Sequence, residues 1–162
     1  MQTHGQNTEN APVEETESNY PIRITRYELV NDSDGPGKFR GGLGLRRDYL
    51  FPDHEASFTI LSDRDRWGPH GLFGGEPGRV AQYFLLRGGQ EIPLGSKTTV
   101  QIQPGDIISF RTCGGGGYGA PFERDPQLVL RDVRDGMVSV ERAREEYGVV
   151  LATNVQSVDE IA

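Results

Sequence analysis

Residues 113–119 read CGGGGYG, and this glycine run restricts the possible folds more than any other part of the sequence. Each glycine loses more conformational freedom on folding than any other residue, so four in a row indicate backbone geometry that side chains would forbid. A phosphate-binding loop would continue with lysine and then serine or threonine at the start of a helix, whereas Gly119 is followed by APFERDP. The run therefore favours close passage of the backbone over neighbouring structure.

The composition narrows the class of protein. The 162 residues are 35% hydrophobic and 25% charged, which suits one globular domain. The net charge of -7 disfavours nucleic acid and anionic membranes as partners. One cysteine excludes an internal disulfide, and no stretch approaches the roughly 20 apolar residues of a membrane helix. We therefore expect a cytoplasmic chain with no nucleic-acid or membrane partner.

The hydrophobic pattern divides the chain into three parts. Residues 1–20 form a polar leader with almost no apolar side chains, which is not expected to fold by itself. Residues 21–119 form a β-rich domain, in which short alternating runs are separated by glycine and proline. Strands are predicted in IRITRYEL, with an irregularity near its middle, and in FRGGLGLRRDYLF, ASFTILS, AQYFLL, TTVQI and DIISF.

Residues 120–162 form a tail with helical signals. Asp125 as N-cap and Pro126 at the first helical position predict one short helix that stops before Gly136. Ser139 as N-cap and Gly148 as C-terminal stop predict a second. Its apolar face is expected to hold Val140, Ala143 and Tyr147. The predicted class is α+β, mainly an antiparallel β sandwich or barrel with two short C-terminal α-helices.

The residues do not assemble a catalytic centre. His4, His54 and His70 lack the spacing of metal ligands, and Cys113 lacks a neighbour that would activate its thiol. The alternation Asp63–Arg66 could orient a carboxylate, although solvated ion pairs explain it as well. We assign no catalytic residue and no metal site to this chain.

Five phrases, in order, carry a family resemblance that runs from about His4 to Leu151. They are HGQNTENAPVE, GKFRGGLGLRRDY, WGPHGLFGGEPG, QPGDIISFRTCGGGGYGAPFERDP and VLRDVRDGMVSVERAREEYGVV. The chain resembles the C-terminal part of the hydantoinase B/oxoprolinase family (N-methylhydantoinase B-like). Met1 aligns within the family's interior, which implies a split gene product, a separate subunit or a shortened reading frame.

The resemblance implies that this chain is the C-terminal part or small subunit of an ATP-dependent cyclic-amide hydrolase. Such a chain acts on a small-molecule substrate only with the N-terminal portion of the B subunit and a hydantoinase A-type subunit. ATP with Mg and a divalent metal are expected elsewhere in the assembly, with no cofactor bound by this chain alone. Two alternatives stay open: a component of an acetone or acetophenone carboxylase-like enzyme, and a non-catalytic assembly module.

The resemblance also implies site residues. His4, Asn7, Thr8, Asn10, Pro12 and Glu14 match a family segment that lies toward the catalytic side, whereas Gly5, Gln6 and Ala11 depart from it. Asn7, Thr8, Asn10 and Glu14 are therefore the substrate-side candidates, because amides, hydroxyls and carboxylates can orient a lactam. A capped polar loop is the alternative. The family's glycine bend, a corner between the last strand and the terminal helices, is matched by Gly114, Gly115, Gly116, Gly117 and Gly119.

Overall fold

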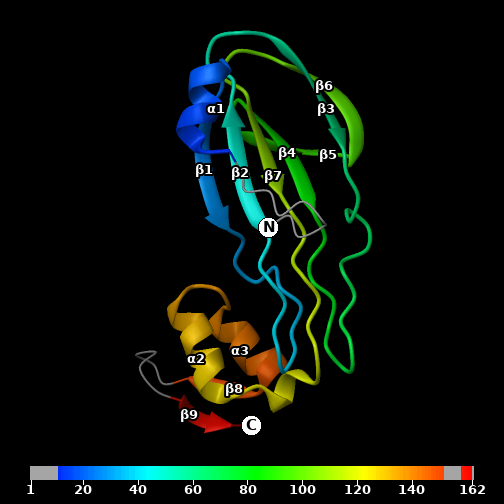
Figure 1. The fold of residues 1–162 in the computed structure, drawn as a ribbon, viewed down its shortest axis with the longest axis vertical. Helices are drawn as coiled ribbons and strands as arrows, with labels where there is room; N and C mark the ends of the chain where they lie inside the picture. Colours follow the sequence, from blue (N-terminus) through cyan, green and yellow to red (C-terminus); the bar gives the residue numbers. More distant parts are fainter. Residues whose placement is uncertain (1–10, 152–157, 162) are drawn as a thin grey trace.

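The structure is a computed structural model that describes residues 11–151 and 158–161. The strands between residues 23 and 111 lie at one end together with helix α1 (Val13–Asn19), whereas helices α2 (Pro126–Arg134) and α3 (Val140–Tyr147) and a further short pair of strands lie at the other (Figure 1). Antiparallel strands followed by two short helices confirm the predicted α+β class. Within the described residues, no helix is long and apolar enough to cross a membrane.

The main sheet has five antiparallel strands, and a separate pair of strands lies over one of its faces. The main sheet has the order β1-β2-β7-β4-β5, and the covering pair is β3-β6. Ile60 and Ile102 of the covering pair and Ile108 of the main sheet are almost completely buried. The bounds are β1 Arg23–Leu29, β2 Leu45–Leu50, β3 Ala56–Leu61, β4 Gln82–Arg87, β5 Gln90–Leu94, β6 Lys97–Ile102 and β7 Ile107–Arg111.

The face of the main sheet away from β3 and β6 carries ion pairs. Arg46 Nη2 lies 2.7 Å from Asp48 Oδ2, and Arg111 Nη2 lies 2.6 Å from Glu91 Oε1. Burial by itself would raise the pKa of Asp48, but hydrogen bonds from Arg46 and Ser109 hold that pKa below its usual value. The carboxylate therefore stays charged beneath the long arginine side chains that cover it.

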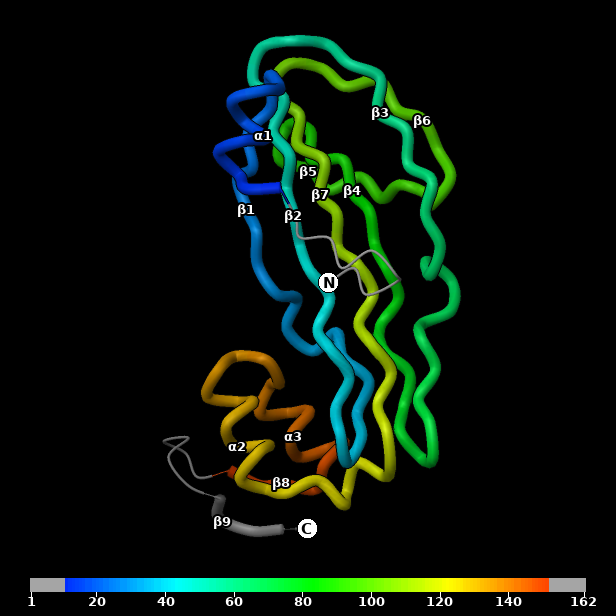
Figure 2. Tube along the Cα trace, in the orientation of Figure 1, coloured from blue at the N-terminus to red at the C-terminus, as the bar shows by residue number. Residues whose placement is uncertain are grey.

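Three extended segments connect the sheets to the helical end: residues 31–44, 62–81 and 112–120. Figure 2 shows them running side by side below the strands. Backbone hydrogen bonds join the segments outside any regular strand, which satisfies groups that would otherwise be buried without partners. Among them, Gly35 N donates to Gly115 O (2.7 Å), Gly115 N to Gly42 O (2.8 Å), Gly117 N to Glu76 O (2.9 Å) and Gly114 N to Arg79 O (3.2 Å).

The glycine run lies at the centre of these contacts. A Cβ atom on Gly114, Gly116 or Gly117 would lie 1.8–1.9 Å from the carbonyl oxygens of Ser33, His70 and Pro36, respectively. Real Cβ atoms do not approach backbone so closely. The run therefore lies between the other two glycine-rich segments, residues 31–44 and 62–81, and at these glycines there is no room for a side chain.

The helical end has its own small core. Asp125 accepts a hydrogen bond from Gln127 N, and Ser139 accepts one from Arg142 N, as the capping signals predict. Gly148 ends α3 in the left-handed conformation (φ 68°). The buried residues are Val129, Val138, Ala143, Tyr147 and Val149. The prediction for Val140 was wrong, because this first residue of α3 is 43% exposed.

Other parts of the fold differ from the sequence prediction or add to it. The irregularity expected in the first strand is confirmed between Ile24 and Arg26. Helix α1, strand β5 and the antiparallel pair β8 (Val149–Leu151) and β9 (Val158–Ile161) were not predicted.

Candidate functional site

Of the four predicted substrate-side residues, Asn7, Thr8 and Asn10 lie outside the described residues. Glu14 lies in the first turn of α1 and is exposed. The helix is tied to the sheet through Glu17 Oε1, which accepts a hydrogen bond from Ile24 N at 2.7 Å. The predicted role of Glu14 thus remains a prediction, and the structure places its side chain at the outer surface of the β-rich end.

Two neighbouring hollows in the β-rich end lie on the apolar face of the main sheet. One, of about 510 Å³, is lined by Tyr27, Leu45 and Arg47 among others. A second, of about 430 Å³, is lined by Tyr20, His54 and other residues. Tyr49 and Phe110 line both hollows, so the two are neighbours on one face.

Strand pairing explains why these side chains meet. Leu45, Arg47 and Tyr49 alternate along β2 and therefore point to one face of the sheet. Arg47 is paired with Tyr27 on β1 and with Phe110 on β7, so these three residues form a row across the sheet. This row forms part of the lining of the first hollow.

Arg47 is held in place by two aromatic side chains. Its guanidinium carbon lies 4.2 Å from the centre of the Tyr27 ring, and its Nη1 donates to the hydroxyl of Tyr49 at 3.3 Å. Burial works to lower the pKa of Arg47, but hydrogen bonds with Tyr49 and Tyr27 raise it above the usual value. The hollow therefore contains a permanent positive charge beside apolar walls.

The remaining reactive side chains form no catalytic group in the described residues. Cys113 lines the first hollow next to Thr112, whose hydroxyl accepts a hydrogen bond from Leu45 N at 2.8 Å. Asp63 and Lys97 form an exposed ion pair at another hollow, where solvent weakens the attraction. In the part of the chain that the structure describes, no group of three or more His, Cys, Asp or Glu could hold a metal ion.

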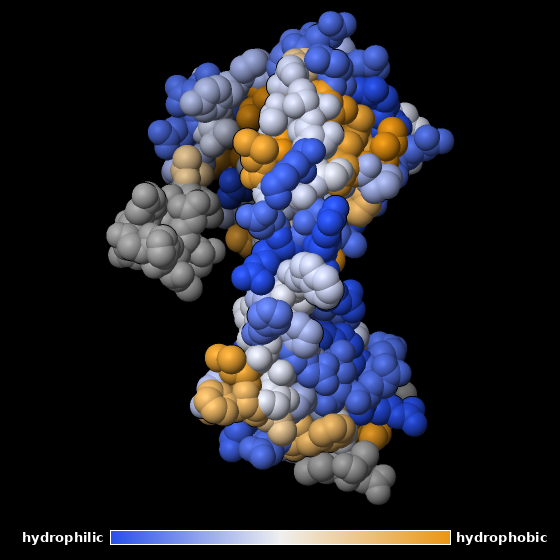
Figure 3. All heavy atoms as spheres, turned by 90° about the vertical axis from the view of Figure 1, so that its right-hand side faces the viewer, coloured by the Kyte–Doolittle hydropathy of each residue, from blue (hydrophilic) through white to orange (hydrophobic). Residues whose placement is uncertain are grey.

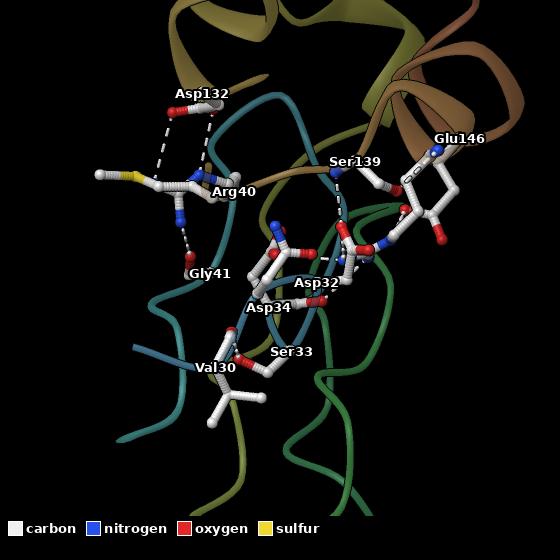
Figure 4. A network of polar contacts seen from close by, with 12 residues as sticks. Val30, Asp32, Ser33, Asp34, Arg40, Gly41, Asp132, Ser139 and Glu146 are labelled. Atoms are coloured by element: carbon white, nitrogen blue, oxygen red, sulfur yellow. Dashed lines mark hydrogen bonds and ion pairs between the residues drawn. The ribbon is translucent and has the colours of Figure 1, made fainter. Parts of the chain in front are cut away.

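A buried network joins the glycine-rich segments to the helices (Figure 4). Arg142 Nη1 lies 3.1 Å from Asp34 Oδ1, and Arg142 Nε lies 2.6 Å from Glu146 Oε2. Burial raises the pKa of Asp34, although the nearby Arg142 and Arg40 oppose this effect. Burial likewise raises the pKa of Tyr147, whose hydroxyl lies 3.5 Å from Asp34 Oδ2. This network anchors the scaffold and does not line the hollow.

Sequence reasoning missed Tyr27 and Arg47 as site residues. A signal was present: residues 43, 45, 49 and 51 form an apolar stripe of one parity, and the arginine at 47 interrupts it. That alternation alone does not predict which residues of β1 and β7 lie beside Arg47 in the sheet.

The fold defines a class of α+β protein. In this class, a two-layer antiparallel β scaffold is joined by glycine-rich segments to a helical end. The chain matches the family described as hydantoinase B/oxoprolinase over residues 1–121. It is 38% identical over 156 residues to a putative D-/L-hydantoinase B subunit from Pseudomonas sp. (strain NS671), covering 94% of this chain and 26% of that protein.

Two solved structures are also similar. The ATP-dependent caprolactamase from Pseudomonas jessenii superposes with a TM-score of 0.76 at 32% identity, over 93% of this chain and 26% of that chain. A nucleotide-free acetone carboxylase superposes with a TM-score of 0.73 at 25% identity, over 93% of this chain and 25% of that chain. The chain belongs to the hydantoinase B/oxoprolinase family and spans about a quarter of the length of these proteins.

Proposed function

We propose that this chain is the C-terminal part or small subunit of an ATP-dependent cyclic-amide hydrolase of the hydantoinase/oxoprolinase type. It would act on a small-molecule substrate, in the cytoplasm, together with the rest of a B-type subunit and an A-type subunit. The observation that carries the proposal is the similarity to a hydantoinase B-type polypeptide along 94% of this chain but only 26% of that protein. The chain would thus supply one portion of a larger enzyme.

The chemistry of the described residues agrees with a supporting role. ATP with Mg and the divalent metal would be bound by the other polypeptides, and in agreement with this no group of three or more His, Cys, Asp or Glu among the described residues could hold a metal ion. We therefore assign no step of the reaction to a metal on this chain.

A second candidate is a component of a ketone carboxylase, which the superposition on acetone carboxylase favours. The two candidates differ in the product: a hydrolase opens a cyclic amide, whereas a carboxylase incorporates bicarbonate. A non-catalytic assembly module is the third candidate, favoured by the lack of a nucleophile and base pair among the described residues. Alanine at Asn7, Thr8, Asn10 and Glu14 together would leave turnover of the assembled enzyme unchanged if that third role were correct.

An exposed apolar surface supports the need for assembly. We call it the distal patch and define it as Phe39, Leu72, Phe73 and Tyr118, at the end of the glycine-rich segments. Phe73 is 79% exposed, and its ring centre lies 5.1 Å from that of Tyr118. Figure 3 shows hydrophobic surface on the lower lobe, beyond a largely hydrophilic waist. Rigid exposed aromatics are typical anchors of protein interfaces.

Phe73→Asn is expected to weaken assembly at least tenfold, since aromatic anchors contribute about 2 kcal/mol or more to an interface. Phe73 has a positive φ of 52°, a conformation that asparagine tolerates well, so the loop should keep its shape. The measurement is co-purification of this chain with the caprolactamase β polypeptide from which the matching segment has been removed. Leu61→Asn is the matched control, because Leu61 is 83% exposed but lies on β3.

The proposed function is tested by activity. We expect ATP-coupled opening of a cyclic amide by the chain together with a B-type remainder and an A-type subunit, and none by the chain alone. Robust turnover by the isolated chain would falsify the dependence on other polypeptides. Equal co-purification of the Phe73→Asn and wild-type chains would instead exclude only the distal patch as the interface.

A further inference from the structure

Arg47 stands out because it is a cation on the apolar face of the main sheet. Its neighbours along that face of β2 are Leu45 and Tyr49, and its cross-strand neighbours are Tyr27 and Phe110. Placing a charge among apolar side chains is unfavourable unless a partner compensates it. Stacking on the Tyr27 ring compensates only part of this cost, because a cation–π contact at a partly exposed site is weak.

The other arginines on the central strands show what Arg47 lacks. Arg46 on β2 pairs with Asp48, Arg87 on β4 with Asp106, and Arg111 on β7 with Glu91. Within residues 11–151, no carboxylate lies in ion-pair contact with Arg47. The pairs made by Arg46 and Arg111 lie on the opposite face of the sheet, so neither can supply its anion to Arg47.

The hollow beside Arg47 has the size and lining of a small-molecule site. Its volume of about 510 Å³ falls within the roughly 300–1,000 Å³ of ligand pockets. Leu43, Leu45 and Phe110 supply apolar walls, while Arg47 and Thr112 supply polar groups. A few polar groups set among apolar walls fix the orientation of a ligand and give specificity.

We propose that this hollow binds a small molecule that carries a carboxylate on a compact apolar body. The carboxylate pairs with the guanidinium of Arg47, which Tyr27 and Tyr49 hold in position, and the apolar body lies against Leu45 and Phe110. Arginine suits this role because its planar fork of donors matches the two oxygens of a carboxylate. The site stands apart from the proposed function, because binding needs no other polypeptide.

The test compares two probes of the same shape on the full 162-residue chain. Phenylacetate carries the carboxylate, whereas phenylacetamide replaces it with a neutral amide. In a titration followed by two-dimensional NMR, phenylacetate should shift the signals of Tyr27, Arg47 and Phe110. Phenylacetamide should bind with an affinity at least about tenfold lower than that of phenylacetate, because the charge-assisted hydrogen bonds to Arg47 are lost.

Substitutions of Arg47 test whether its charge is responsible for the binding of phenylacetate. Arg47→Met should lower the affinity for phenylacetate about tenfold or more while leaving that for phenylacetamide nearly unchanged. Arg131→Met makes the same change of charge on the exposed side of α2 and should bind phenylacetate as the wild type does. Arg47→Gln serves as the second variant if the NMR spectrum of Arg47→Met shows that this variant is unfolded. Equal affinity for the two probes, no binding of phenylacetate, or an unchanged affinity in a folded Arg47 variant would each overturn the proposal.

Discussion

Gly116→Ala is expected to lower the free energy of unfolding by about 4 kcal/mol or more, which is among the largest effects of a single substitution. The new Cβ would lie 1.9 Å from the carbonyl oxygen of His70 and 2.4 Å from its carbonyl carbon. Both atoms belong to backbone, so relief requires two chain segments to separate. Separation would break neighbouring backbone hydrogen bonds such as that from Gly117 N to Glu76 O.

Gly42→Ala is the matched control for this prediction. A Cβ on Gly42 would meet nothing within 4 Å, although Gly42 O accepts a hydrogen bond from the same glycine run. Its effect should stay within about 1 kcal/mol of zero, and it can be stabilising because alanine restricts the unfolded chain. Chemical denaturation followed by circular dichroism measures both variants. A Gly116→Ala protein as stable as Gly42→Ala would show that the glycine-rich segments separate easily.

Crowded glycines recur along the three connecting segments, which explains how these segments can lie so close. Gly35, Gly41 and Gly44, like Gly114 and Gly117, lie three or six residues apart, and a Cβ on each would meet backbone within 2.5 Å. Repeated glycine is thus a condition for this close backbone contact.

The parts of the fold that sequence reasoning captured are those set by local chemistry. The caps at Asp125 and Ser139 act within one turn of their helices, and the alternation in ASFTILS is a property of one strand. Strand β5 was not predicted; it contains Pro93, which is unfavourable inside a sheet but tolerated at an edge, and β5 is the edge of the sheet. Helix α1 was missed because none of its residues is buried.

The candidate site was harder to predict, because its parts come together only through sheet pairing. Tyr27 and Arg47 are far apart in the sequence and become neighbours through the register of β1 against β2. The glycine run was recognisable as a region of close contact, but the places that it touches, at Ser33, Pro36 and His70, could not be identified, because a glycine-rich sequence does not indicate which other segment lies against it.

Arg142→Met is expected to lower the free energy of unfolding by about 3–5 kcal/mol, because it leaves a buried carboxylate without its partner. Asp34 is completely buried, and Arg142 binds both its carboxylate and its backbone carbonyl, each at 3.1 Å. Lys97→Met is the control: it removes an exposed ion pair with Asp63 and should change stability by at most about 1 kcal/mol. Thermal and urea unfolding measure both variants.

The pH dependence of the Arg142→Met variant distinguishes a lost charge pair from lost side-chain contacts. Without Arg142, burial should raise the pKa of Asp34 further in the folded state, while the unfolded chain titrates near about 3.9. Between those two values the folded state holds a proton that the unfolded state has released, so stability falls as the pH rises. The wild-type pKa of Asp34 is already raised, so the deficit relative to wild type should grow only above that pKa, and it should be larger at about pH 7 than at about pH 4. Adding Asp34→Asn should remove this pH dependence and restore part of the stability, whereas a deficit that is equal at both pH values would assign the effect of Arg142 to its packing alone.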